Sequence, residues 1–209
     1  MDGTCNCPEG YAGANCENFD LSMVQLLLNA GVAPLELFNG GVPLDSLYGK
    51  TYSGGLIFYL DTLVGTGLVA DIKDIGTGIA WGCQGVNIPN LNDVNSPPPL
   101  SGPETEEGAR IGDGITNTIA IIEGCGEDQI AAKFCQAIGP EWFLPSRYEL
   151  RLMYNNLHLN GYGNFITMDF YFSSTEINDV VVSTVNFSNG SRFHDNKGSF
   201  RTARAAKAY

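Results

Sequence analysis

The residues of this sequence that could perform chemistry do not form a catalytic set. Only two histidines occur, His158 and His194, and neither has a nucleophile at a known catalytic spacing. The sequence contains no G-x-S-x-G, P-loop, H-E-x-x-H or G-x-G-x-x-G motif. We therefore predict that the chain is not an enzyme.

Two carboxylates near the C-terminus could hold a cation. Glu176 and Asp179 supply oxygen ligands of the kind that calcium prefers. We consider calcium at these two side chains and expect no other cofactor. The adjacent acidic pairs at residues 106–107 and 127–128 are expected to be solvated surface charges instead.

The segment at residues 171–200 has the composition of a recognition surface. It mixes valine, isoleucine and phenylalanine with asparagine, aspartate, serine, histidine and arginine. Aromatic side chains supply apolar contact area, and asparagine and aspartate supply oriented hydrogen bonds. We predict a ligand site, for a glycan or a surface protein, made of Ile177, Asp179, Val180, Val181, Ser191, Arg192, Phe193, His194, Asp195 and Ser199.

The charge of the chain excludes some partners. Asp and Glu number 23 against 11 Lys and Arg, which gives a net charge of −12. Such a chain repels nucleic acid and anionic membranes, and it has no apolar run long enough to enter a membrane. Five basic residues near the C-terminus are expected to be ordinary solvated charges, namely Arg192, Lys197, Arg201, Arg204 and Lys207.

The six cysteines indicate an oxidising compartment, so the protein is predicted to be secreted or on the cell surface. Cys83 and Cys125 both lie at glycine-rich turns, whereas Cys135 lies on an apolar helical face. We favour a Cys83–Cys125 disulfide with Cys135 as a buried thiol. A Cys125–Cys135 pair is the alternative, because sequence alone does not fix connectivity.

The first half of the chain alternates short helical turns with strands. A short helix is predicted at residues 23–29, ended by Gly31 and Pro34, and two further single turns follow, each ended by glycine. A buried strand at residues 54–61 should pair with residues 67–72. A third short strand is expected at residues 78–83, and residues 84–110 are predicted to be a long surface loop.

The second half should contain helices followed by strands. Apolar spacing predicts helices at residues 113–124 and 127–138. Ser146 and Glu149 form a capping-box pattern that opens a third helix with an apolar stripe. Asn189-Gly190 predicts a two-residue hairpin turn. The C-terminal strands are predicted at residues 169–176, 180–187 and 201–208.

The N-terminal pattern C-x-C-x8-C, with Gly-Tyr-x-Gly inside, resembles the C-terminal half of an EGF-like module. The resemblance implies that Cys7 pairs with Cys16. Cys5 would then pair with a residue further upstream, which indicates that the natural N-terminus has been removed.

The rest of the chain carries "GGLIFYLD", "AWGC", "EWFLPSRYELRLMYNNL", "YFSSTE" and "RAAKAY". These motifs resemble the C-terminal lectin-like domain of bacterial collagen-like adhesins. They are also similar to the formylglycine-generating-enzyme branch of the C-type-lectin-like fold. Some such bacterial proteins have C-terminal segments diversified by retroelements, and the mixed segment at residues 171–200 has that character.

The resemblance implies an α+β fold, a C-type-lectin-like domain with a small twisted antiparallel sheet and flanking helices, preceded by the EGF-like fragment. The expected parts are residues 1–18 (partial EGF-like module), 19–47 (helical connector) and 48–209 (lectin-like domain). The formylglycine-generating activity is not expected to carry over, since no cysteine follows Cys135. The sugar-binding calcium motifs of C-type lectins are also missing from the sequence.

Two functions remain open from the sequence. The first is an adhesin-type binding module that recognises its ligand through the C-terminal face. The second is a structural subunit of an extracellular bacterial fibre or surface assembly, in which the leucine-rich residues 19–47 form a homo-oligomer interface. The two differ in whether the chain associates with copies of itself.

Overall fold

The computed structural model describes residues 11–12, 18–89 and 108–209, which form an α+β fold. The helices are η1 (Leu21–Met23), α1 (Val24–Asn29), α2 (Pro34–Asn39), α3 (Leu44–Leu47), α4 (Asp113–Gly124), α5 (Ala131–Gln136), α6 (Arg147–Asn156) and η2 (His158–Asn160). The strands are β1 (Tyr11–Ala12), β2 (Asn18–Phe19), β3 (Thr51–Tyr52), β4 (Gly55–Leu60), β5 (Gly67–Ala70), β6 (Gly76–Ala80), β7 (Trp142–Phe143), β8 (Phe170–Glu176), β9 (Val181–Asn186), β10 (Arg192–Asn196), β11 (Phe200–Ala203) and β12 (Ala206–Ala208).

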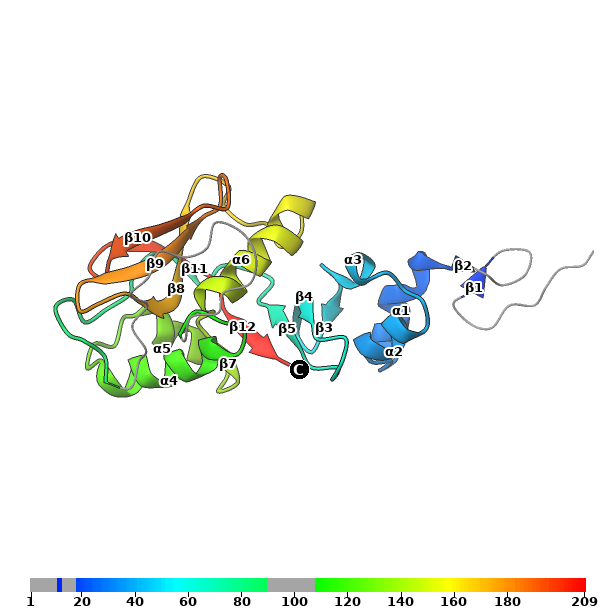
Figure 1. The fold of residues 1–209 in the computed structure, drawn as a ribbon, viewed down its shortest axis with the longest axis horizontal. Helices are drawn as coiled ribbons and strands as arrows, with labels where there is room; N and C mark the ends of the chain where they lie inside the picture. Colours follow the sequence, from blue (N-terminus) through cyan, green and yellow to red (C-terminus); the bar gives the residue numbers. More distant parts are fainter. Residues whose placement is uncertain (1–10, 13–17, 90–107) are drawn as a thin grey trace, which may run out of the picture.

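Most of these strands form two five-stranded sheets, where the sequence predicted one small sheet. One sheet has the order β3-β4-β5-β12-β7, and the other has the order β10-β9-β8-β11-β6. Only β8 and β11 run parallel among the paired strands that the structure describes. Along the longest axis, α1 and α2 lie toward one end and β9 and β10 lie at the other (Figure 1).

The last segment of the chain joins the two sheets. Residues 201–208 were predicted as a single strand, and that prediction is wrong. β11 pairs with β6 and β8, whereas β12 pairs with β5 and β7 in the other sheet. The strand is interrupted at Arg204, whose buried side chain bonds to loops that lie between the sheets.

The helical segment before the sheets is an internal repeat with a period of ten residues. In α1 the Ala30 amide donates to the Leu26 carbonyl at 2.9 Å, and in α2 the Gly40 amide donates to the Glu36 carbonyl at the same distance. Gly31 and Gly41 follow these turns with φ of 95° and 98°, a conformation that favours glycine. Leu26 and Glu36 therefore occupy equivalent positions.

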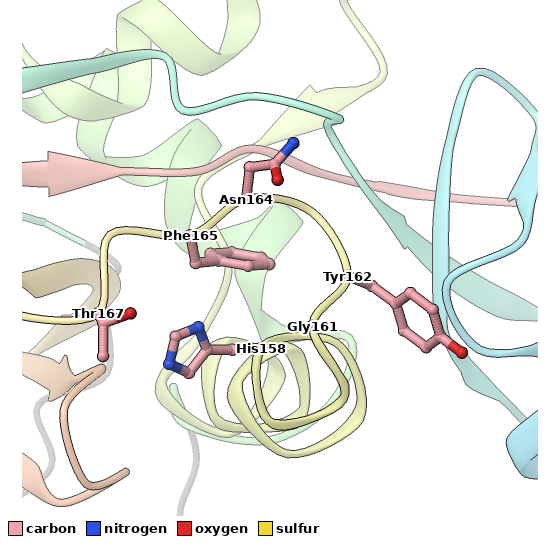
Figure 2. A pocket seen from close by; sticks show the side chains of 6 residues that line it. All are labelled: His158, Gly161, Tyr162, Asn164, Phe165 and Thr167. Atoms are coloured by element: carbon pink, nitrogen blue, oxygen red, sulfur yellow. The ribbon is translucent and has the colours of Figure 1, made fainter.

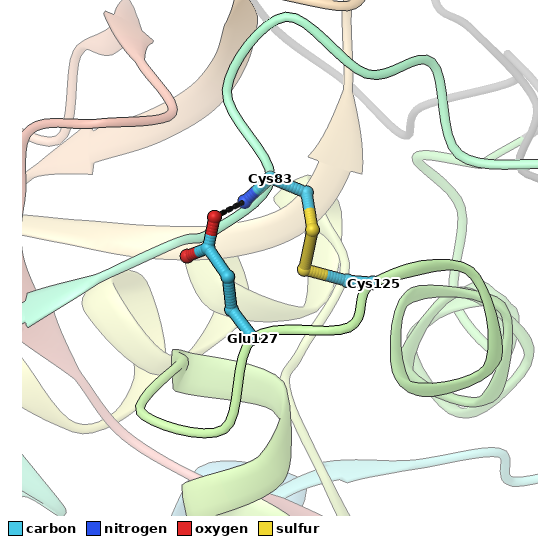
Figure 3. A group of neighbouring side chains, drawn as sticks. All are labelled: Cys83, Cys125 and Glu127. Atoms are coloured by element: carbon cyan, nitrogen blue, oxygen red, sulfur yellow. Dashed lines mark hydrogen bonds between the residues drawn. A yellow bond between two sulfur atoms is a disulfide. The ribbon is translucent and has the colours of Figure 1, made fainter.

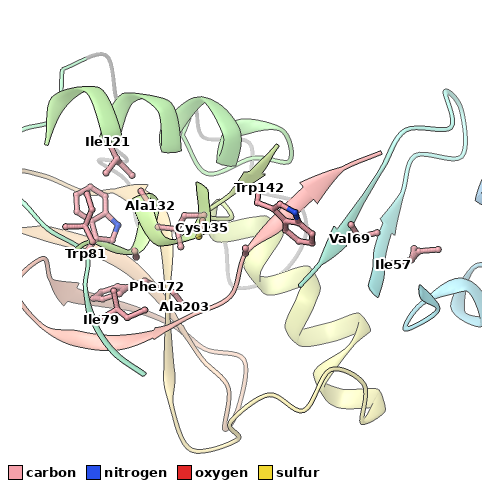
Figure 4. Close-up of a cluster of buried hydrophobic side chains, with 14 of the residues drawn as sticks. Ile57, Val69, Ile79, Trp81, Ile121, Ala132, Cys135, Trp142, Phe172 and Ala203 are labelled. Carbon is pink, nitrogen blue, oxygen red and sulfur yellow. The ribbon is translucent and has the colours of Figure 1, made fainter. Parts of the chain in front are cut away.

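Two apolar clusters form the interior. The larger one extends from α1 and α2 through β4 and β5 to the inner face of β8, α4 and α5 (Figure 4). The smaller one lies under α6, where Leu150, Met153 and Leu157 are buried as their helical spacing predicted. The Ser146–Glu149 capping box is present at the start of α6, as predicted. The first cluster includes residues on both sides of residue 47, where the sequence predicted a boundary between a helical connector and the following domain. That boundary stays a prediction.

The turn between β9 and β10 is longer than the two-residue hairpin that Asn189-Gly190 predicted. The Asn186 amide donates to the Ser191 carbonyl, so residues 187–190 form the loop. Phe187, the first residue of this loop, is fully buried and its ring contacts Tyr154 and Tyr171. The predicted loop at residues 84–110 lies largely outside the described residues, which include it only up to residue 89 and from residue 108.

Candidate functional site

One part of the predicted recognition segment forms a compact surface cluster, which we call the β10 platform. It consists of Phe170, Phe193, Asp195, Ser199 and Arg201. The rings of Phe170 and Phe193 lie 5.4 Å apart, and the Arg201 guanidinium carbon lies 5.4 Å from the centre of the Phe170 ring. Phe193 is 53% exposed although it is a large apolar residue. The cluster thus presents an aromatic surface beside a charged pair.

The charged groups of the platform are held in place by hydrogen bonds. Arg201 Nε donates to Asp195 Oδ2 at 2.5 Å, and the Ser199 hydroxyl donates to Asp195 Oδ1 at 2.7 Å. Partial burial raises the pKa of Asp195, but the hydrogen bonds from Ser199 and Arg201 outweigh it and hold the pKa below its usual value. Asp195 is therefore a fixed carboxylate at neutral pH, able to accept a hydrogen bond from a partner.

The structure separates the other predicted site residues from this cluster. Arg192 and His194 flank Phe193 in β10, so their side chains point to the opposite face of the strand. The remaining residues, Ile177, Asp179, Val180, Val181 and Ser191, lie at the two ends of the β8–β9–β10 meander. The predicted set is thus one platform and several unconnected positions.

Two platform residues, Phe170 and Arg201, were not predicted. Each lies one residue outside the segment at 171–200 that was singled out, and the pairing of β8 with β11 brings them together. Arg201 was interpreted as a solvated charge. The only sequence pattern that could have placed Arg201 on the platform is the alternation of Phe200, Arg201 and Thr202. Three residues are too few to predict which face of a strand each side chain occupies.

A buried ion pair lies beneath the predicted calcium position. Lys197 Nζ pairs with Glu176, and both side chains are fully buried. The same ammonium group donates to the Val86 carbonyl at 2.7 Å and lies 4.8 Å from the centre of the Trp81 ring. Glu176 is therefore engaged with a lysine and is not available to join Asp179 in a calcium site, which corrects that expectation.

Arg204 forms a second buried ion pair, between the two sheets. Its Nε donates to Asp74 at 2.7 Å, and its guanidinium carbon lies 3.9 Å from the centre of the Phe165 ring. Tyr171 donates to the other oxygen of Asp74 at 2.9 Å. Lys197 and Arg204 were both expected to be solvated, so the sequence misassigned two of the five C-terminal basic residues.

The predicted Cys83–Cys125 disulfide is present, and Cys135 is a buried free thiol as expected. Burial raises the pKa of the Cys135 thiol well above its usual value. Glu127 lies beside the disulfide and accepts a hydrogen bond from the Cys83 amide at 3.1 Å (Figure 3). These three residues could offer donor atoms to a metal, but the two sulfurs are bonded to each other. The Cys7–Cys16 pairing lies outside the described residues.

A shallow hollow near η2 has a volume of about 180 Å³ and is lined by His158, Gly161, Tyr162, Asn164, Phe165 and Thr167 (Figure 2). Phe165 offers no open ring face there, because Arg204 covers one side at 3.9 Å and Phe187 stacks on it at 5.0 Å. A sugar ring would therefore find no free face of Phe165 to stack on. The β10 platform is the better candidate site.

Glu149 is a buried carboxyl group that joins two helix starts. It accepts hydrogen bonds from the Ser146 amide at 2.7 Å and from the Gly112 amide at 2.8 Å, at the N-termini of α6 and α4. Burial raises the pKa of Glu149 to about 7, although these backbone hydrogen bonds act in the opposite direction. The group therefore titrates near neutral pH.

We predict that Glu149 makes the stability of the fold depend on pH. Because the pKa in the folded chain lies above the usual value of 4.5, the contribution of Glu149 is fully present below pH 4.5 and is lost as the pH rises through 7. The loss is about 3 kcal/mol. Urea unfolding of the natural chain and of Glu149→Gln should be compared at several pH values. The glutamine side chain has one acceptor oxygen fewer than Glu149 at every pH, but the difference in unfolding free energy between the two chains should shrink at high pH. A difference that does not change with pH would contradict the raised pKa of Glu149.

The described residues thus define an α+β protein with a rigid, disulfide-bonded frame and an aromatic platform on an edge strand. No helix among them is both long and apolar enough to span a membrane. No family model matches the chain, and no curated protein matches it. A solved structure of a fimbrial protein from Bacteroides ovatus is similar, with a TM-score of 0.43 and 14% sequence identity. The likeness covers 84% of this chain but only 41% of the fimbrial protein.

The comparisons correct the family expected from the sequence motifs. The chain was expected to resemble the lectin-like domain of collagen-like adhesins and the formylglycine-generating-enzyme branch, with a partial EGF-like module in front. No family model of either kind matches, and a solved structure to which the chain is similar is that of a fimbrial protein. The motifs that suggested the relationship are short, and each has a structural role here, such as the capping box that begins α6.

Proposed function

We propose that this chain is a non-catalytic structural subunit of an extracellular bacterial fibre or surface assembly. The observation that carries the proposal is the β10 platform, an exposed aromatic surface on the edge strand of a sheet. Aromatic residues and arginine are enriched where proteins contact one another, and an edge strand has a row of backbone groups open to a partner. The disulfide supports a location outside the cytoplasm.

The frame beneath the platform suits a permanent assembly. The Glu176–Lys197 and Asp74–Arg204 pairs and the Cys83–Cys125 disulfide fix the sheets and loops around β8 and β10. A surface that is rigid before it binds loses less conformational entropy on association. A platform held in this way favours a stable contact with another macromolecule.

The proposal is tested on cells that produce the protein. Material sheared from the cell surface should contain the chain in species much larger than a single copy, and Phe193→Gln should move the chain into the medium. Leu159→Gln, at an apolar residue of η2 that is 62% exposed, is the matched control and should leave the chain in the sheared material. Recovery of the natural chain only at the mass of a single copy would contradict a structural role.

A second candidate is glycan recognition at the same platform. It is favoured by the fixed Asp195–Arg201 pair beside the Phe170 ring, since stacking and charge-assisted hydrogen bonds are what a sugar requires. A glycan array, run with calcium and with chelator, should then give a signal that Phe193→Gln abolishes. No signal for the natural chain would exclude this candidate for the glycans tested.

A further inference from the structure

Three side chains away from the β10 platform bring metal-ligating atoms together, namely Cys83, Cys125 and Glu127. Their two sulfurs and a carboxylate oxygen lie within 4.8 Å of one another (Figure 3). Cys83 follows β6, whereas Cys125 and Glu127 follow α4, so two segments that are distant in the sequence supply the donors. Both cysteines are buried, and Glu127 is exposed to solvent. Thiolates and a carboxylate are ligands that zinc accepts.

Backbone hydrogen bonds hold the two turns that carry these residues. Beside Cys83, the Gly85 amide donates to the Asp179 carbonyl at 2.8 Å. At the other turn, the Cys125 amide donates to the Ile121 carbonyl at 2.9 Å. These bonds do not involve sulfur, so we expect the three donor groups to stay near one another when the disulfide is absent.

The Glu127 carboxylate is oriented beside the sulfurs but carries an uncompensated charge. The Cys83 amide donates to its Oε1 at 3.1 Å. Lys133 pairs with the neighbouring Asp128 at 3.0 Å instead, and no ion pair involves Glu127 within the part of the chain that the structure describes. A bound divalent cation would compensate this charge and would deprotonate the two thiols that it coordinates.

The redox state of the cysteines determines whether these groups can hold a metal. In the disulfide form the two sulfurs are bonded to each other, and neither is a thiolate. Disulfides form in an oxidising compartment, so a newly synthesised chain first contains both cysteines as thiols.

We propose that Cys83, Cys125 and Glu127 of the dithiol chain bind a zinc ion, with water as the fourth ligand, and that formation of the disulfide releases it. In the release step the two thiolates give two electrons to a disulfide oxidant, which takes up two protons and becomes two thiols. The protein sulfurs bond to each other, and the metal leaves as Zn²⁺. Before oxidation, zinc therefore joins the turn after β6 to the end of α4, as the disulfide does afterwards.

Cobalt titration of the full-length reduced chain tests the site. Cys5, Cys7 and Cys16 are replaced by serine, because these thiols would bind metal themselves, and a phosphine keeps the remaining thiols reduced. We expect one equivalent of Co²⁺ to produce the near-ultraviolet absorption of a thiolate–cobalt bond, and Zn²⁺ to abolish it. Adding Cys83→Ser with Cys125→Ser should remove the absorption. An absorption that persists in that variant, or none in the reduced chain, would overturn the proposal.

Two carboxylate variants test the third ligand. Glu127→Gln keeps an oxygen that can accept from the Cys83 amide but loses the charge. Zinc should bind this variant about tenfold or more weakly, since even residues that only orient metal ligands contribute that much. Asp128→Asn, at the exposed neighbouring carboxylate, is the matched control and should leave zinc binding unchanged. Equal zinc binding by Glu127→Gln and Asp128→Asn would exclude Glu127 as a ligand.

Stability and zinc release test the redox coupling. Zn²⁺ should raise the urea midpoint of the reduced chain but not that of the oxidised chain, and it should restore the circular dichroism spectrum if the reduced chain is unfolded without metal. Glutathione disulfide added to the zinc-loaded chain should release one zinc ion for each Cys83–Cys125 bond formed, measured with a colorimetric chelator. Zinc that has no effect on the reduced chain, or that stays bound after oxidation, would contradict the proposal.

Discussion

Replacing Lys197 by methionine is expected to destabilise the fold by about 3–5 kcal/mol. Lys197 and Glu176 are both fully buried, and the lysine also donates to the Val86 carbonyl. Methionine fills a similar volume but leaves the Glu176 carboxylate buried without its cation. An uncompensated buried charge costs far more than the net value of the pair. Urea unfolding followed by circular dichroism measures the loss.

Two controls separate charge from packing. The double variant Lys197→Met with Glu176→Gln removes both charges and should recover most of the lost stability, since the amide oxygen of the new side chain can still accept from the Ile88 amide. The same substitution at a surface ion pair, Lys133→Met opposite Asp128, should cost less than about 1 kcal/mol. If the single and double variants at position 197 were equally unstable, packing rather than charge would explain the loss.

The second large effect is expected from the disulfide. Cys83 and Cys125 are 42 residues apart in sequence, and the bond closes the loop that contains residues 90–107. The chain-entropy model gives a loss of about 4 kcal/mol when a loop of this length is opened. The variant Cys83→Ala with Cys125→Ala should therefore unfold at a clearly lower urea concentration than the natural chain.

Cys135→Ala is the matched control for the disulfide variant. It also removes a buried sulfur but keeps the cross-link, so it should cost only about 1 kcal/mol for the cavity it leaves. Adding a reducing agent should weaken the natural chain and the Cys135→Ala variant by the same amount. A disulfide variant as stable as the Cys135→Ala variant would show that the cross-link contributes nothing.

Local patterns in the sequence determined most of the helices and strands. The capping box at Ser146 and Glu149, the apolar stripe of α6 and the paired strands β4 and β5 all follow from neighbours within a few residues. The disulfide could be chosen because both cysteines lie at glycine-rich turns. Such signals are short-range, so they are readable without knowing how the chain closes on itself.

The candidate site depended on sheet order, which local patterns do not contain. The sequence named Phe193, Asp195 and Ser199 but grouped them with Ile177 and Ser191, which the structure places elsewhere. Phe170 and Arg201 join the platform because β8 and β11 lie side by side in a parallel pair. Pairing between distant segments decides which side chains meet, and a single sequence does not record it.

The sequence by itself determined the acidic charge and the buried face of α6, whereas the apolar spacing in α4 misled, because Ile115 and Ile119 are 43% and 46% exposed. The tertiary structure alone decided the fate of the basic residues near the C-terminus. Lys197 and Arg204 read as ordinary surface charges, yet both are buried because Glu176 and Asp74 are brought to them from other strands and loops. A charge is solvated or buried according to the partner that the fold supplies, and that partner lies 21 residues away in one case and 130 in the other.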